Sequence, residues 1–234
     1  MSMITQLDEI RARIAAAARA GAREPETVEL VAVSKTHPAA AVRALLEQGQ
    51  RCFGENRVQE AMEKFPPLRA LYPDLRLHLI GPLQTNKVSD AIHGFDVIET
   101  LDRPRLADAI ARAAEKAGRM PELLVQVNIG DEAQKAGIPR REAHAFIRAC
   151  RDRFGGAVTG LMCIPPAQDD PAPHFRALAS MAAECGLPGL SMGMSADFEA
   201  AIIAGATRVR VGSALFGTRA MTASSTPDPG APRL

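Results

Sequence analysis

Eight short apolar runs alternate with helical patterns along most of the chain, and this alternation is the strongest constraint on its fold. The runs cover residues 29–35, 51–54, 76–81, 95–99, 122–129, 157–163, 189–192 and 207–211. Short runs rich in β-branched residues are typical of buried parallel strands. Helical patterns lie at 39–48, 57–71, 103–117, 140–151, 173–185 and 196–204, with a weaker one at 85–93. Eight strand–helix units in succession predict an α/β fold, a single closed (β/α)8 TIM barrel rather than an open doubly wound sheet.

The segments before and after this alternation predict an extra helix and a tail. An apolar pattern at helical spacing, followed by Gly21, predicts an N-terminal helix over residues 4–20 that packs on the outside or the bottom of the barrel; the pattern consists of Ile4, Leu7, Ile10 or Arg11, Ile14 and Ala18. One barrel occupies most of a 234-residue chain, so we expect one domain over residues 1–220. Residues 221–234 are rich in Ser, Thr, Pro and Gly and are expected to form a disordered tail.

Composition and missing motifs exclude several classes of function. A net charge of +1 without basic runs argues against nucleic-acid binding, and no run of 18 apolar residues is present to span a membrane. The four cysteines form no CxxC pair and none has a histidine at a metal-ligand spacing, which argues against structural zinc and a disulfide framework and fits a reducing cytoplasm. No Asp/Glu pair lies at metal-ligand spacing from a histidine either, so we expect no metal site. HExxH, GxSxG, Walker A and GxGxxG patterns are absent, which weakens hydrolase and nucleotide-binding interpretations.

Lys35 ends the first apolar run, Leu30 to Lys35, and precedes Pro38, which is typical of a helix start. The last residue of a barrel strand lies at the carboxyl end of the sheet, where α/β barrels carry their active sites. Partial desolvation there favours the neutral form of an amine, which condenses with aldehydes. The alternative is an ordinary solvated lysine at the rim of the barrel.

The last two strands end in loops that suit an anion. Strand 189–192 continues into Gly193, Met194 and Ser195, and strand 207–211 continues into Gly212 and Ser213 before a short helical stretch. These are the barrel positions at which backbone N–H groups commonly bind phosphate. Ser195 as an ordinary helix cap and Gly212–Ser213 as an ordinary turn are the alternatives.

Three further polar residues lie on strands or strand ends near this mouth. Arg210 is expected to point into the barrel, where its guanidinium needs an acceptor, either an aromatic nitrogen of a ligand or a neighbouring carboxylate. Asn56 follows the second strand and either faces the ligand or caps the next helix. His78 lies inside the third strand, where a structural role is the alternative to ligand contact.

Together these residues resemble the pyridoxal phosphate homeostasis protein family, also called YggS/PROSC, whose members have the barrel of fold-type III pyridoxal 5′-phosphate (PLP) proteins. The resemblance covers residues 7–217 in order. The stretches that carry it are LVAVSKT at 30–36, FGENRVQE at 53–60, HLIGPLQTNK at 78–87, VNI at 127–129, GLM at 160–162, LSMGMS at 190–195 and VRVGS at 209–213.

The resemblance implies that Lys35 carries PLP as a Schiff base and that Arg210 meets the pyridine nitrogen. It further implies phosphate contacts from Ser195, Gly212 and Ser213, with Asn56 and His78 flanking the ring, and no catalytic residue. Three positions depart from the family pattern: His37 stands where lysine is common, Pro82 where arginine or histidine is frequent, and Ser213 where threonine is frequent. Ser213 keeps the hydroxyl, whereas the other two put contacts at the rim in doubt.

The implied function is a cytoplasmic PLP carrier that takes part in vitamin B6 homeostasis and releases or delivers the cofactor. The alternative is a weak or promiscuous PLP-dependent amino acid racemase. An alanine racemase of this fold type needs a second acid/base, usually a tyrosine from an additional domain, whereas the single tyrosine here, Tyr72, is expected away from the mouth. A third possibility is an interaction module that hands PLP to apo-enzymes. We expect a monomer.

Overall fold

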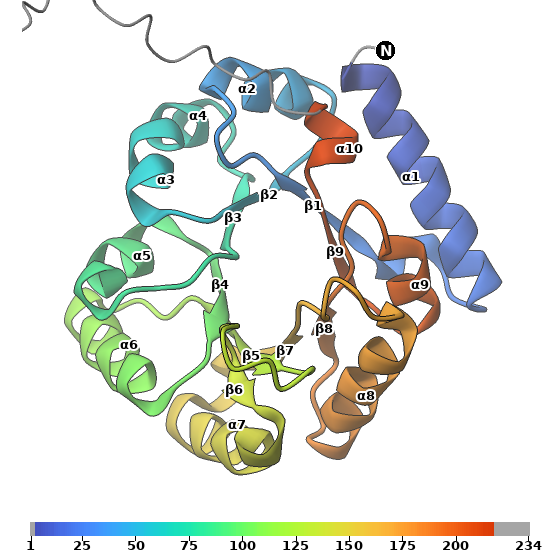
Figure 1. Cartoon of the computed structure of the whole chain (residues 1–234). Coiled ribbons are helices and arrows are strands. Elements are labelled where there is room, and N and C mark those ends of the chain that lie inside the picture. Colours follow the sequence, from blue (N-terminus) through green and yellow to red (C-terminus); the bar gives the residue numbers. More distant parts are fainter. Residues whose placement is uncertain (1–2, 218–234) are drawn as a thin grey trace, which may run out of the picture.

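The computed structural model describes residues 3–217, so the predicted tail at 221–234 lies outside the described residues. Eight parallel strands form a closed ring, because β1 pairs with both β2 and β9 while β4 pairs with β5 (Figure 1). The ring contains β1 (Glu29–Val33), β2 (Cys52–Glu55), β3 (Arg76–Leu79), β4 (Val97–Leu101), β5 (Glu122–Asn128), β7 (Val158–Met162), β8 (Gly189–Ser191) and β9 (Arg208–Val211). The predicted (β/α)8 barrel is confirmed.

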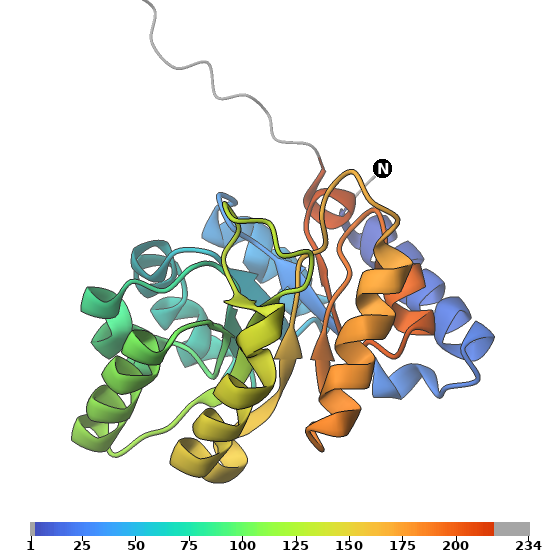
Figure 2. The same ribbon diagram turned by 60° about the horizontal axis from the view of Figure 1, so that its bottom comes forward.

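Parallel pairing places all the carboxyl ends of these strands at one end of the barrel. Ala32 of β1, for example, lies opposite Phe53 of β2 and Val211 of β9. The loops that follow the strands therefore gather around one mouth, at the upper end in Figure 2, where the last helix also lies. A ninth short strand, β6 (Ile138–Pro139), pairs with the end of β5 and was not predicted.

The helices cover the outer face of the ring (Figure 1). They are α1 (Met3–Ala20), α2 (Ala39–Glu47), α3 (Val58–Lys64), α4 (Pro66–Leu71), α5 (Val88–Gly94), α6 (Pro104–Ala117), α7 (Arg140–Phe154), α8 (Pro171–Glu184), α9 (Phe198–Ile203) and α10 (Ser213–Phe216). Short 3-10 turns are η1 (Pro25–Thr27), η2 (Thr85–Lys87) and η3 (Gly155–Ala157). Within residues 3–217, no helix combines the length and apolar character needed to cross a membrane.

The single helix predicted over residues 57–71 is wrong, because the structure divides this segment into α3 and α4. The break falls at Phe65, directly before Pro66 and Pro67. A proline has no backbone N–H and its ring clashes with the preceding turn, so a helix cannot continue through the pair. Phe65 is buried at this junction and packs against Phe53 of β2.

Helix α1 lies outside the barrel, as predicted, beside α9 and α10 (Figure 1). It buries Leu7, Ile10 and Ile14 against the barrel, which is the spacing expected of one apolar helix face. Arg13 on its exposed side forms an ion pair with Glu199 of α9. The N-terminal helix therefore covers the outside of the barrel close to the seam where the last strand meets the first.

The amino-terminal end of the barrel is closed by four charged residues, the base cluster Glu29, Arg76, Glu122 and Arg208. Each is the first residue of its strand. Arg208 donates from Nη2 to Glu122 Oε1 at 2.7 Å and from Nε to Glu29 Oε2 at 3.2 Å. Arg76 Nη2 donates to Glu122 Oε2 at 2.9 Å. The charges at this end are therefore paired with one another, although Arg208 Nη1 has no hydrogen-bond partner among the described residues.

Candidate functional site

A cavity of about 650 Å³ opens at the mouth of the barrel, a size within the range of small-molecule sites. Six of the seven predicted site residues line it: Lys35, Asn56, Ser195, Arg210, Gly212 and Ser213. Apolar side chains of Val33, Ile80 and Ile164 form part of its wall. Residues distant in the sequence therefore meet around a space that combines an amine, hydroxyl groups, backbone N–H groups and an apolar surface.

Lys35 lies two residues after the end of β1 and is half-buried. Among residues 3–217 it takes part in no ion pair, so its amine is not held by a carboxylate. The next residue, Thr36, has a φ of 65°, in the left-handed region. A β-branched residue rarely adopts this conformation, so the backbone directly beside Lys35 is strained.

Two glutamates and a second lysine surround the backbone of Lys35, and the sequence did not predict them. Lys64 Nζ donates to Ser34 O at 3.0 Å and lies 2.8 Å from the carboxylates of both Glu55 and Glu60. Glu55 Oε1 also accepts from Ser34 Oγ at 2.7 Å, and Glu60 Oε1 accepts from the Thr36 N–H at 2.6 Å. We call Glu55, Glu60 and Lys64 the flanking triad.

The two carboxyl groups of the flanking triad differ in acidity. Complete burial raises the pKa of Glu55 although hydrogen bonds from Lys64 and Ser34 act in the opposite direction. Glu60 is less buried; burial still opposes its ionisation, but hydrogen bonds from Lys64 and the Thr36 N–H hold its pKa below the ordinary value. Glu60 is therefore the member that stays ionised most readily.

The opposite side of the cavity is formed by the loops after β8 and β9. Ser195 Oγ accepts hydrogen bonds from the N–H groups of Gly212 and Ala214, both at 3.4 Å. Because α9 begins at Phe198 with Asp197 at its N-cap, Ser195 does not cap that helix. A Cβ at Gly212 would lie 3.3 Å from Val33 Cβ, so glycine brings this loop close to β1. Two backbone N–H groups and the hydroxyl thus converge at one place.

Asn56 lies at the cavity wall and does not cap α3. Arg57 occupies the N-cap position, and no side chain donates or accepts a capping hydrogen bond there. The loop after β3 passes so close that a Cβ at Gly81 would lie 2.3 Å from Asn56 O. Only glycine allows this approach, so Gly81 fixes where the backbone of Asn56 lies.

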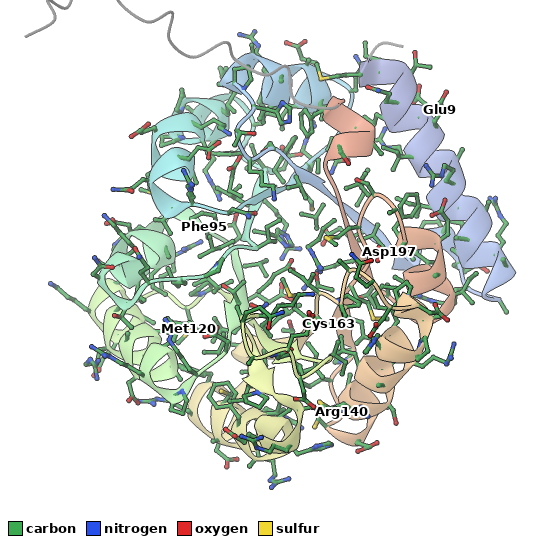
Figure 3. All side chains as sticks on the ribbon, in the orientation of Figure 1. Glu9, Phe95, Met120, Arg140, Cys163 and Asp197 are labelled. Carbon is green, nitrogen blue, oxygen red and sulfur yellow. The ribbon has the colours of Figure 1, made fainter. Side chains whose placement is uncertain are left out.

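Arg210 lies in the floor of the cavity and is 4% exposed. Its Nη1 donates to Ser191 Oγ at 2.6 Å, and its Nη2 donates at 2.8 Å to the carbonyl oxygen of Cys163, which is labelled in Figure 3. Ser191 in turn donates to Glu99 Oε2. Arg210 is therefore oriented by a hydroxyl and a carbonyl, and Glu99 neutralises its charge from one residue further away.

His78 is not brought to the cavity. It faces the barrel interior but is fully buried, and its Nδ1 lies 2.7 Å from Glu99 Oε1. Burial opposes ionisation of Glu99, but hydrogen bonds from His78 and Ser191 and the charge of Arg210 lower its pKa. With Glu99 ionised, the Nδ1–H of His78 donates to it. His78 thus supports the floor below Arg210 rather than the cavity wall.

One group of possible metal ligands lies deeper in the barrel and does not suit a cation. Glu29, Cys52 and His78 place ligand atoms within 4.8 Å of one another. Burial raises the pKa of the Cys52 thiol, and the guanidinium groups of Arg208 and Arg76 lie beside Glu29. A neutral thiol and two neighbouring positive charges oppose cation binding.

The cavity suits the chemistry of PLP, which carries an aldehyde and a phosphate on a flat ring. Lys35 supplies an amine on one side, and Ser195, Gly212 and Ser213 supply a hydroxyl-rich anion site on another. Apolar walls and the Arg210 guanidinium lie between them. The residues that line the cavity thus fit the aldehyde, the phosphate and the ring of the cofactor.

Comparison with known proteins decides the family. The sequence matches the family described as alanine racemase, N-terminal domain, over residues 5–220. It is 42% identical over 227 residues to the pyridoxal phosphate homeostasis protein of Pseudomonas aeruginosa, covering 94% of this chain and 97% of that protein. The chain belongs to the pyridoxal phosphate homeostasis protein family. The resemblance predicted from the sequence is confirmed.

Solved structures agree with this family assignment. PipY of Synechococcus elongatus, a structure with PLP bound, is 36% identical with a TM-score of 0.81, and the match covers 92% of this chain and 100% of PipY. Alanine racemase of Streptomyces lavendulae matches at 23% identity with a TM-score of 0.68, covering 91% of this chain and 58% of the racemase. The match to PipY supports the family assignment, whereas the match to alanine racemase shows a shared fold.

Some features of the sequence point to the site residues that were not predicted, but none of them specifies the contacts that these residues make. Glu55 directly follows the apolar run 51–54, and Glu99 ends the run 95–99. An acidic residue at either position indicates a partner but does not say which one. Glu60 and Lys64 are spaced four residues apart, the usual spacing of a helical ion pair. Nothing in the sequence connects that pair to Ser34 and Thr36.

Proposed function

We propose that this chain binds PLP as a Schiff base on Lys35, takes part in PLP homeostasis, and releases or delivers the cofactor to other proteins. The observation that carries the proposal is that one cavity brings together Lys35, which forms no ion pair within residues 3–217, and the loops with Ser195, Gly212 and Ser213. The family relationship and the PLP bound in the PipY structure support the same ligand.

In this proposal the amine of Lys35 attacks the aldehyde carbon, a C=N bond forms, and the carbonyl oxygen leaves as water. Ser195, Ser213 and the backbone N–H of Gly212 hold the phosphate, and Asn56 lies beside the ring. Arg210 donates to the pyridine nitrogen. Because a guanidinium keeps its proton, the ring nitrogen stays unprotonated and withdraws electrons weakly, which favours storage over catalysis.

The test is spectroscopic and chemical. Purified protein incubated with PLP should absorb as a protonated Schiff base, and borohydride reduction followed by peptide mapping should place the cofactor on Lys35. Lys35→Ala should abolish trapping, whereas Lys116→Ala, which removes an exposed lysine on α6, should leave it unchanged. A colourless wild-type protein or an adduct on another lysine would disprove the proposal.

A weak amino acid racemase is the second candidate, favoured by the fold shared with alanine racemases. A racemase of this kind needs an acid/base on each face of the substrate. The only tyrosine, Tyr72, does not line the cavity. Its ring lies 5.5 Å from the guanidinium of Arg51, and Arg51 precedes the first residue of β2, at the end of the barrel opposite the mouth. We therefore expect no Lys35-dependent racemisation in a chiral assay over several amino acids.

Delivery to apo-enzymes is the remaining part of the proposal, with the protein expected as a cytoplasmic monomer. Loaded protein should reactivate a PLP-dependent apo-enzyme in the presence of a scavenger that destroys free PLP. Equal reactivation by loaded protein and by the same amount of free PLP, both suppressed by the scavenger, would show simple release without transfer through contact.

A further inference from the structure

The flanking triad forms hydrogen bonds with the residues on both sides of Lys35 and does not line the cavity. On one side Lys64 Nζ and Glu55 bind the carbonyl and hydroxyl groups of Ser34. On the other side Glu60 accepts the N–H of Thr36. None of the three triad residues is among those that line the cavity. Their contacts therefore act on the Lys35 backbone and not on a ligand.

The strained conformation of Thr36 indicates what these hydrogen bonds do: they hold the backbone next to Lys35. A non-glycine residue at a φ of 65° relaxes unless its surroundings hold it there. The 2.6 Å hydrogen bond from the Thr36 N–H to ionised Glu60 is a charge-assisted contact, one of the stronger kinds available to a backbone amide. The Thr36 N–H belongs to the peptide unit that follows the Lys35 Cα, and Ser34 O, which Lys64 binds, belongs to the peptide unit that precedes it. Holding both peptide units fixes the direction in which the Lys35 side chain leaves the backbone.

The two lysines at this end of the barrel have opposite roles. An ammonium group has three N–H donors, and Lys64 directs them to three acceptors, Ser34 O, Glu55 and Glu60. Its side chain is 9% exposed. Lys64 is therefore held as a charged crosslink, whereas Lys35 has no ion pair among the described residues.

We propose that Glu60 and Lys64 are positioning residues that hold Thr36 in its left-handed conformation and so aim the Lys35 amine into the cavity. The inference rests on the proposed function, because it assigns these residues a role in PLP capture at Lys35. Without the carboxylate of Glu60, Thr36 relaxes and only a fraction of molecules presents Lys35 correctly, which weakens apparent affinity in proportion.

The experiment compares variants at Glu60 by the rate and extent of PLP capture, followed by absorbance and borohydride trapping. Glu60→Ala removes the acceptor, and the cost of an unsupported left-handed residue predicts a loss of about tenfold in both apparent affinity and capture rate. Glu60→Gln keeps an oxygen for the Thr36 N–H and should capture PLP much better than Glu60→Ala. Glu63→Ala removes an exposed carboxylate from the same helix and serves as the charge control.

A rescue variant separates positioning from general damage. Glycine adopts the left-handed region without steric cost, so adding Thr36→Gly to Glu60→Ala should restore much of the capture rate. Wild-type capture by Glu60→Ala, or an equal loss in Glu63→Ala, would overturn the inference. So would a failure of both Glu60→Gln and Thr36→Gly to improve on Glu60→Ala.

A measurement on protein without PLP tests this inference separately from the proposed function. Hydrogen exchange of the Thr36 amide in ligand-free protein should be faster in Glu60→Ala than in Glu60→Gln or Glu63→Ala. If wild-type protein forms no Schiff base, the proposed function fails, and the exchange data still decide whether Glu60 holds the backbone. Equal exchange in all three variants would disprove that it does.

Discussion

The two ends of the barrel use charged side chains in opposite ways. At the amino-terminal end, the base cluster pairs Arg208 and Arg76 with Glu29 and Glu122. At the mouth, Lys35 takes part in no ion pair within the described chain and faces a cavity. The contrast teaches that the base cluster is built from charges that pair with one another, whereas the mouth keeps one amine without an ionic partner inside residues 3–217.

The largest expected effect comes from breaking the base cluster. Arg208→Met leaves Glu29 without its nearest cation and Glu122 with only Arg76, and a partly buried arrangement broken on one side should lose about 3 kcal/mol of unfolding free energy. Urea denaturation measures this loss. Borohydride trapping per folded molecule should stay at the wild-type level, because the change lies at the far end of the barrel.

Arg76→Met is the matched control at the same end. The Arg76 side chain is 44% exposed, and Glu122 keeps Arg208, so the loss should stay below about 1 kcal/mol. Equal destabilisation by the two variants would contradict the view that Arg208 organises the cluster. A loss of PLP capture in folded Arg208→Met would break the separation between the two ends.

A smaller effect is expected at the mouth. Ser195→Ala removes the hydroxyl on which two backbone N–H groups converge, and the loss of one hydrogen bond to a charged group predicts about tenfold weaker PLP binding. Affinity for pyridoxal, which has no phosphate, should not change. Titration by absorbance gives both constants.

Ser180→Ala, an exposed serine on α8, is the control for Ser195→Ala and should bind both compounds normally. Unfolding free energy should change little in either variant. Parallel losses for PLP and pyridoxal in Ser195→Ala would show that the serine acts on the ring or the aldehyde instead of the phosphate.

The smallest expected effect is a pH dependence from Glu122. Burial opposes its ionisation, but hydrogen bonds from Thr159 and Arg208 and nearby positive charge hold its pKa below the ordinary value of 4.5. A depressed folded-state pKa stabilises the fold above the unfolded-state pKa, and this stability is lost as the pH falls through the folded-state value.

Glu122→Gln should therefore cost about 1 kcal/mol near neutral pH and flatten the fall in stability below pH 4.5. Thermal unfolding midpoints between neutral and acid pH measure both effects. Glu63→Gln, on the exposed side of α3, should keep the wild-type slope. Identical acid slopes in Glu122→Gln and wild type would assign the pH dependence to other carboxyl groups, with Glu99 the next to examine.

Much of the fold follows from local patterns. The eight apolar runs became the eight strands of the ring, and their carboxyl ends brought Lys35, Asn56 and the loops after β8 and β9 to one mouth. These features depend on strand alternation and on which end of a parallel strand a residue occupies, both of which the sequence encodes directly.

Local sequence patterns do not predict how far a strand residue lies from the mouth or which residues of different elements touch. His78 faces the interior as expected, but its distance from the mouth depends on register: it lies opposite Gly54 and Val97, where it meets Glu99. The contact between Lys64 and Ser34 joins residues 30 positions apart, so it depends on how α3 lies beside the end of β1, which no local pattern in the sequence specifies.

The closure between β1 and β9 has a consequence for synthesis on the ribosome. Glu29 pairs with Arg208, 179 residues later, so the first strand emerges long before its second neighbour exists. Until the end of translation the nascent sheet keeps two open edges, a state prone to intermolecular pairing, and it lacks the loops after β8 and β9 that form one side of the cavity. Under the proposed function, PLP capture would require a polypeptide that includes the last strand, and prematurely terminated chains would keep an open sheet edge and bind no cofactor.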